Sequence, residues 1–212
     1  MSKNPIRGYY LKKLFIAFIL TNIIFLAIII ISFSVSYLNY QQISEQSNTI
    51  STYLEELDSF SQFSNCENEV LIKASERLDE VGVKIGLLEN RFGKNDPRVL
   101  EQKEFYSELE LKHFNIVKRL ESECGNDFIT VLFFYTNTKP FDEESENMGF
   151  IISTFKNEDP RKIMVYSFDF NLDADVINDL KETYQVNGAP IALVNERATV
   201  YVRNINDLKE YL

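Results

Sequence analysis

Two cysteines and one histidine are the side chains best suited to redox or metal chemistry in this sequence of 212 residues. Cys66 and Cys124 lie far apart and form no Cys-x-x-Cys motif, and His113 has no second ligand candidate at a helical spacing from it. A structural zinc site usually takes four nitrogen or sulfur ligands. The sequence therefore predicts no metal site and no cofactor, and it favours a packed, hydrogen-bonded role for His113.

Four acidic residues crowd a short stretch before an apolar helical pattern: Asp142, Glu143, Glu144 and Glu146. Carboxylates near a helix start complement the helix dipole. They lack the regular ligand spacing of a calcium-binding loop. We therefore interpret them as the solvated first turn of a helix.

The overall charge excludes nucleic acid as a partner. The chain has 22 Lys and Arg against 32 Asp and Glu, a net charge of -10, whereas nucleic-acid binding needs a basic face. The charges are also unevenly placed, because residues 14–44 carry none and every acidic residue follows them. This distribution indicates a membrane segment followed by an acidic body.

The uncharged run from Leu14 to Val35 predicts a transmembrane helix in contact with membrane lipid. At 1.5 Å per residue it would be roughly 33 Å long, enough to cross the hydrocarbon core. A secretory signal peptide is the alternative, but its apolar region usually spans only about 7–15 residues. We expect an uncleaved signal anchor over residues 14–36.

The basic residues near this segment predict its orientation. Four of them lie in residues 1–13, and the next one is Lys73. Basic residues favour the cytoplasmic side. We therefore expect a single-pass cell-membrane protein with residues 1–13 in the cytoplasm and everything after the segment extracytoplasmic.

Residues 46–124 predict an antiparallel helical hairpin that acts as a coiled-coil stalk. Apolar residues alternate at spacings of three and four, which is a heptad seam: Leu71, Ala74, Leu78, Val81, Ile85, Leu88 and Phe92. Gly93 can end this helix and Asp96-Pro97 can begin the next one. A homo-oligomer through the seam is an alternative use of the same pattern.

The hairpin places the two cysteines opposite each other. Cys66 lies almost as far before the turn as Cys124 lies after it, so a disulfide can join them if their side chains point inward. Extracytoplasmic surroundings permit such a bond. A redox-active pair is the alternative, although neither cysteine has an exchange motif beside it.

Residues 127–212 predict an α/β domain. Strand patterns at 129–135, 162–170, 191–194 and 199–202 alternate with helical patterns at 145–156, 174–184 and 204–212. The order β-α-β-α-β-β-α implies a central sheet covered by helices.

This order and the stretch Tyr184-Gln185-Val186-Asn187-Gly188-Ala189-Pro190-Ile191 resemble the thioredoxin family. The resemblance implies a thioredoxin-like α/β/α sandwich in which Pro190 follows a cis peptide bond. It also aligns Thr138-Lys139-Pro140-Phe141 with the family's Cys-Gly-Pro-Cys motif. Both cysteines are therefore missing here, and the family's buried Asp is replaced by Leu132.

The resemblance implies a peptide-binding groove without thiol chemistry, because a threonine hydroxyl cannot replace a thiolate in disulfide exchange. Its expected residues are Thr138, Lys139, Pro140, Phe141, Ala189 and Pro190. We expect a non-catalytic module that binds a protein or peptide whose identity the sequence does not give. The alternatives are an oligomerising membrane scaffold or signal relay, and an accessory thiol–disulfide oxidoreductase that uses Cys66 and Cys124.

Overall fold

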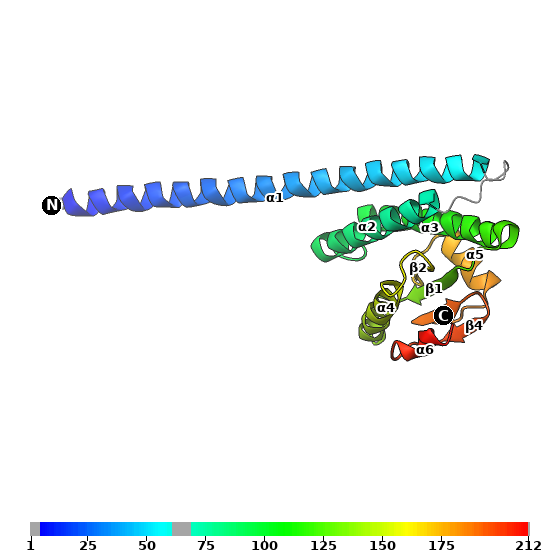
Figure 1. Cartoon of the computed structure of the whole chain (residues 1–212). Coiled ribbons are helices and arrows are strands. Elements are labelled where there is room, and N and C mark those ends of the chain that lie inside the picture. Colours follow the sequence, from blue (N-terminus) through cyan, green and yellow to red (C-terminus); the bar gives the residue numbers. More distant parts are fainter. Residues whose placement is uncertain (1–4, 61–68, 212) are drawn as a thin grey trace. The chain divides into compact units, whose positions relative to one another are not determined.

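The computed structural model describes residues 5–60 and 69–211. The chain divides into two compact units, residues 1–42 and residues 43–212. The first helix, α1 (Pro5–Phe60; Figure 1), contains the one stretch in the described residues that is long and apolar enough to cross a membrane, Lys13–Val35. The expected membrane helix is thus present as an apolar N-terminal helix. Residues 46–60, which we expected to begin the stalk, belong to this same helix.

Two helices, α2 (Glu69–Phe92) and α3 (Pro97–Cys124), occupy the region in which we expected the hairpin. Gly93 follows α2 with a φ of 94°, in the left-handed region that glycine adopts without strain. The Asp96 carboxylate accepts a hydrogen bond from the backbone N–H of Arg98 at 3.0 Å, and Pro97 occupies the first turn. The capping residues therefore act as the sequence indicated.

A four-stranded sheet follows, with the strand order β2-β1-β3-β4. The strands are β1 (Ile129–Tyr135), β2 (Ile163–Asp169), β3 (Ile191–Val194) and β4 (Ala198–Val200). β1 pairs with β2 in parallel and with β3 antiparallel, and β3 pairs antiparallel with β4. The helices between and after them are α4 (Asp142–Lys156), α5 (Asp175–Thr183) and α6 (Asn206–Lys209). The expected order of elements is confirmed, and only their ends differ by a few residues.

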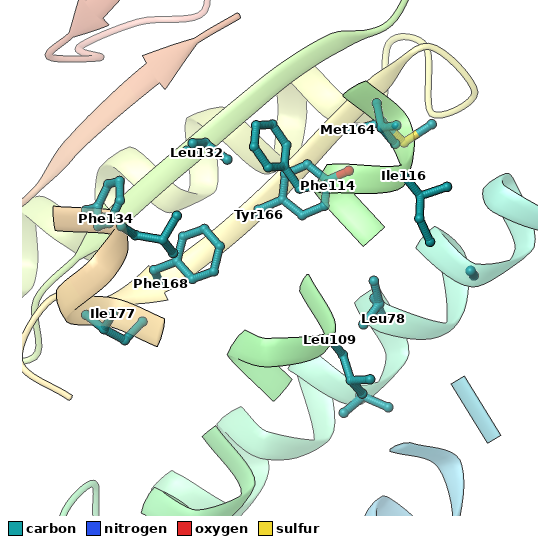
Figure 2. Packing of buried hydrophobic residues seen from close by; sticks show 14 of the residues in the cluster. Leu78, Leu109, Phe114, Ile116, Leu132, Phe134, Met164, Tyr166, Phe168 and Ile177 are labelled. Carbon is teal, nitrogen blue, oxygen red and sulfur yellow. The ribbon is translucent and has the colours of Figure 1, made fainter. Parts of the chain in front are cut away.

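Alternate residues of the strands point into two hydrophobic cores. Leu132 and Phe134 of β1 pack in the same core as residues of α2, α3 and α5, whereas Val131 and Phe133 pack in the core formed with α4 and α6. Figure 2 shows the first core, where Phe114 of α3 lies beside Tyr166 of β2. Their ring centroids are 5.4 Å apart in an edge-to-face arrangement. The fold is therefore a mixed α/β structure with helices on both faces of the sheet.

The hairpin is not a separate stalk. Its heptad seam, from Leu71 to Leu88, is buried in the same core as Tyr166 and Phe168 of the sheet. We expected a stalk over residues 46–124 and a domain over residues 127–212. The described part of the hairpin, α2 and α3, is instead a layer on one face of that domain. The physical reason is that two short amphipathic helices bury more apolar surface against a sheet than against each other alone.

Candidate functional site

A surface groove of about 390 Å³ lies where β3 and β4 meet the start of α4. We call it the Pro190 groove. Ala189 and Pro190 line it at the entry to β3, and Phe141 and Glu144 line it from the α4 side. Tyr201, which follows β4, completes the wall. Phe141 and Tyr201 are 50% and 44% exposed, so two aromatic rings border the groove within reach of solvent.

The local sequence explains how the chain enters β3 beside this groove. Proline has no N–H and therefore suits the first residue of a strand, so Pro190 precedes the first paired residue of β3, Ile191. The Ala189–Pro190 peptide bond is cis, as the sequence resemblance implied. The Lys139–Pro140 bond is cis as well, which the sequence did not indicate.

The groove gathers half of the residues that we expected in it. Phe141, Ala189 and Pro190 line it. Thr138, Lys139 and Pro140 are exposed in the loop between β1 and α4 and do not belong to its lining. The groove is thus bordered by the entry to β3 and by the start of α4 with Phe141 just before it, whereas residues 138–140 of the loop do not line it.

Thr138 is held by hydrogen bonds that suit structure rather than catalysis. Its hydroxyl donates to the amide oxygen of Asn171 at 3.3 Å, and its backbone N–H donates to the hydroxyl of Thr136 at 3.1 Å. The Thr136 hydroxyl also donates to Asn171. An amide oxygen is not a general base, so these contacts do not activate the Thr138 hydroxyl as a nucleophile.

Two glutamates hold the tyrosines of the groove in their neutral form. The Tyr184 hydroxyl donates to Glu196 at 2.5 Å, and burial together with this bond raises the pKa of Tyr184. Glu196 also pairs with Lys118 of α3 at 2.7 Å. A side-chain hydrogen bond to Glu144 raises the pKa of Tyr201. Both phenols therefore stay protonated well above neutral pH.

A second cavity, of about 450 Å³, lies at the opposite edge of the sheet beside β2. We call it the β2-edge cavity. Its lining comes from α2, α3, α4 and the strands, and includes Gly82, Gly86, Lys103, Tyr106 and Ser167. Lys156 of α4 also lines it and reaches Asp79 of α2 at 2.5 Å.

Buried charged groups surround the β2-edge cavity. The ammonium group of Lys103 pairs with Asp169 and, at 2.8 Å, with Glu89. The carboxylate of Glu110 accepts a hydrogen bond from the Ser167 N–H at 2.9 Å. Burial raises the pKa of Glu110 to about 8, although the Ser167 N–H opposes the shift. Glu110 is therefore mostly protonated at neutral pH.

His113 has the packed role that the sequence favoured. It is fully buried, with Nε2 at 2.9 Å from the Leu71 carbonyl oxygen and Nδ1 at 2.8 Å from the Tyr166 hydroxyl. A carbonyl can only accept, so Nε2 carries the proton and Nδ1 accepts from Tyr166. Burial lowers the pKa of His113 to about 4, which keeps the ring neutral.

Sequence reasoning missed the charged residues of α3. Lys103 and Glu110 are seven residues apart and share the inward face of the helix with Tyr106 and His113. That spacing was a usable signal, because charges in phase with a buried seam require partners. Their partners Asp169 and Ser167 lie far away in the sequence, on β2, and no local pattern indicates them.

The expected disulfide stays a prediction. Cys124 is the last residue of α3 and is half-buried, whereas Cys66 lies outside the described residues. Among the residues that the structure describes, no group of three His, Cys, Asp or Glu side chains is arranged to hold a metal ion.

Comparisons with known proteins add little to this geometry. No family model and no curated protein matches the chain. A similar solved structure is that of the germline-specific thioredoxin Deadhead (Thioredoxin-1) from Drosophila melanogaster. It is 22% identical, covers 46% of this chain and 89% of that chain, and has a TM-score of 0.31.

Proposed function

We propose that this chain is a single-pass membrane protein whose extracytoplasmic, thioredoxin-like domain binds an extended segment of a partner protein in the Pro190 groove, without thiol chemistry. The observation that carries the proposal is the groove itself. The half-exposed ring of Phe141 lines it together with the segment that contains Ala189 and Pro190. No cysteine of the described ranges lines the groove. Extended segments are commonly bound through backbone hydrogen bonds together with pockets for side chains.

The membrane anchor supports an extracytoplasmic site. The apolar stretch Lys13–Val35 follows the basic N-terminal residues Lys3, Arg7 and Lys12 and precedes an acidic body. Basic residues favour the cytoplasmic side of a membrane segment. The domain that carries the Pro190 groove would then face the outside, where a tethered binding module can meet exported proteins.

The residues at the aligned motif support binding without redox catalysis. Thr138 and Phe141 stand where the resemblance places the two reactive thiols, and Leu132 stands where it places a buried Asp. Leu132 is fully buried in the hydrophobic core, and the Thr138 hydroxyl is engaged by Asn171. Disulfide exchange requires a thiolate, which neither Thr138 nor Phe141 can supply.

We propose a structural role for the pair Cys66 and Cys124. A disulfide between them would tie the start of the hairpin to the end of α3, and closing a loop of that length stabilises a protein by about 4 kcal/mol on the chain-entropy estimate. Mass spectrometry of the exported full chain under non-reducing conditions tests the pairing. Finding both thiols free would contradict it.

Of the two alternatives, oligomerisation through the heptad seam loses its main support. The seam residues Leu78, Val81 and Ile85 are buried within the chain's own core. The oxidoreductase alternative predicts insulin reduction by the full chain that disappears in both Cys66→Ser and Cys124→Ser. We expect no turnover from the unchanged protein.

Site-specific photo-cross-linking in living cells tests the proposed function. A benzoylphenylalanine residue replaces Phe141 in the groove or, as the matched control, Phe150, which lies within α4, the helix that Phe141 precedes, and is 74% exposed. We expect a defined partner adduct from position 141 only, and its loss when Ala189→Trp fills the groove. Identical adducts from both positions, or an adduct unaffected by Ala189→Trp, would refute the assignment of this groove.

A further inference from the structure

We infer that the partner segment carries a basic side chain, whose charged group lies beside the rings of Phe141 and Tyr201 and pairs with Glu144. This inference rests on the proposed function and adds to it the chemistry of the partner. The Pro190 groove brings the three residues together from two parts of the chain, the start of α4 and the residue after β4.

The aromatic pair favours a cation. Phe141 and Tyr201 line the same groove, yet about half of each side chain stays exposed. The face of an aromatic ring is negative, so exposed rings attract an ammonium or guanidinium group, and they do so more strongly when the cation is partly removed from water. One such contact already exists, because the Arg203 guanidinium carbon lies 5.4 Å from the centroid of the Tyr201 ring.

Glu144 adds a negative charge at the same place. It belongs to the first turn of α4, lines the groove and is hydrogen-bonded by the side chain of Tyr201. Within the described part of the chain, no basic side chain forms an ion pair with it. The carboxylate can therefore accept a bond from an incoming cation.

The other acidic residues near the groove differ from Glu144. Glu196 already pairs with Lys118 at 2.7 Å, and Glu146 has Lys94 at 4.0 Å. Glu143 is exposed in the same turn but does not line the groove. Glu144 is therefore the acid whose charge is directed to a ligand in the groove, and Glu143 is its natural control.

An arginine fits these groups better than a lysine. The planar guanidinium can stack on an aromatic ring while its edge donates to a carboxylate, whereas the lysine ammonium acts as a point charge. The net negative charge of the body, which carries every acidic residue of the chain, also favours a basic partner at long range.

Fluorescence anisotropy with the full chain in neutral detergent micelles tests the inference. The probe is a labelled heptapeptide that alternates Thr and Val around a central Arg, and its counterpart carries citrulline, which has nearly the same shape and no charge. We expect the Arg peptide to bind about tenfold more tightly, the effect of one favourable charged contact. Glu144→Gln should bring the two affinities within about twofold, whereas Glu143→Gln should preserve the preference.

The outcomes separate this inference from the proposed function. Equal binding of both peptides that is lost on Ala189→Trp would overturn the inference and leave the groove as a peptide site. An Arg preference that survives Glu144→Gln would overturn the role of Glu144. Failure of both peptides to bind would overturn the inference and count against the proposed function as well.

Discussion

The two edges of the sheet differ in how far other parts of the chain cover them. At the β2 edge, the backbone N–H of Ser167 is covered by the buried carboxyl group of Glu110, and the Lys156–Asp79 pair joins α4 to α2 across the edge. At the β4 edge, the Pro190 groove leaves the aromatic rings of Phe141 and Tyr201 about half exposed to solvent.

This difference between the two edges helps to separate ionisable groups that stabilise the fold from groups that could bind a ligand. Perturbed pKa values often mark active sites, but ion-pair networks that hold a fold together perturb them as well. Here the large shifts at Glu110 and His113 occur between the hairpin and the sheet, and burial is their main cause. The groove that we propose as the binding site has few such groups. The buried network therefore holds the hairpin on the sheet, and its pKa shifts do not mark a binding site.

Of the substitutions that test this comparison between the two edges, the removal of the Lys103 side chain should change the free energy of unfolding most. Lys103→Ala would leave Asp169 and Glu89 without their buried partner, which typically lowers the free energy of unfolding by about 3–5 kcal/mol. Urea unfolding of the full chain in micelles measures the change. Arg161→Ala is the control, because its exposed pair with Glu69 should contribute at most about 1 kcal/mol. Equal small losses would show that the Lys103 network is not structurally important.

Glu110 should make the stability of the domain depend on pH. Its pKa rises from 4.5 to about 8 on folding, so the folded state retains a proton that the unfolded state loses. The stability that this group contributes is complete below pH 4.5 and declines by roughly 4 kcal/mol as the pH rises to about 8, at 1.36 kcal/mol per pKa unit. Glu110→Gln should therefore gain stability over the unchanged protein as the pH rises. Parallel stability curves for the two proteins would contradict this.

Two glycines of α2 should respond differently to the same substitution. A Cβ at Gly86 meets no atom within 4 Å, so Gly86→Ala should stabilise the helix by about 1 kcal/mol. A Cβ at Gly82 would lie 2.9 Å from the Tyr106 hydroxyl, so Gly82→Ala should gain less or lose stability. Thermal melting of both variants compares them, and equal shifts would show that Tyr106 moves aside freely.

Substitutions at the open edge should hardly affect stability. Phe141 is half exposed, so Phe141→Ala should change the free energy of unfolding by no more than about 0.5 kcal/mol. The same variant should lose most peptide binding in the anisotropy assay. A destabilisation of several kcal/mol would mean that Phe141 has a structural role like that of the β2-edge residues.

The elements of the fold could be predicted from the sequence, because each depends on local signals. The apolar run Ile129–Tyr135 became β1 with the same bounds, and Gly93 with Asp96 marked the turn between α2 and α3. The apolar pattern placed the start of α4 at residue 145, three residues late, whereas the acidic residues from Asp142 onward correctly indicated its first turn. Strand and helix periodicity therefore carried most of this information.

Two features could not be predicted from the sequence: the packing of the hairpin on the sheet, and the groove residues that lie outside the aligned motif, such as Tyr201. A heptad seam has the same spacing whether a helix or a sheet covers it, so the stalk was indistinguishable from a layer of the domain. Tyr201 reaches the groove only because β3 and β4 pair antiparallel, which places Thr199 beside Leu193. Contacts of this kind join distant residues and leave no periodic pattern.

Methyl NMR of the full chain in micelles, titrated with the Arg heptapeptide, tests most directly that binding occurs at the open edge. Ala189, Ile191 and Leu193 provide probes in the Pro190 groove, while Val83 and Ile85 provide probes in the β2-edge cavity. We predict saturable shifts at the first set and unchanged positions at the second. Shifts confined to Val83 and Ile85 would contradict the account.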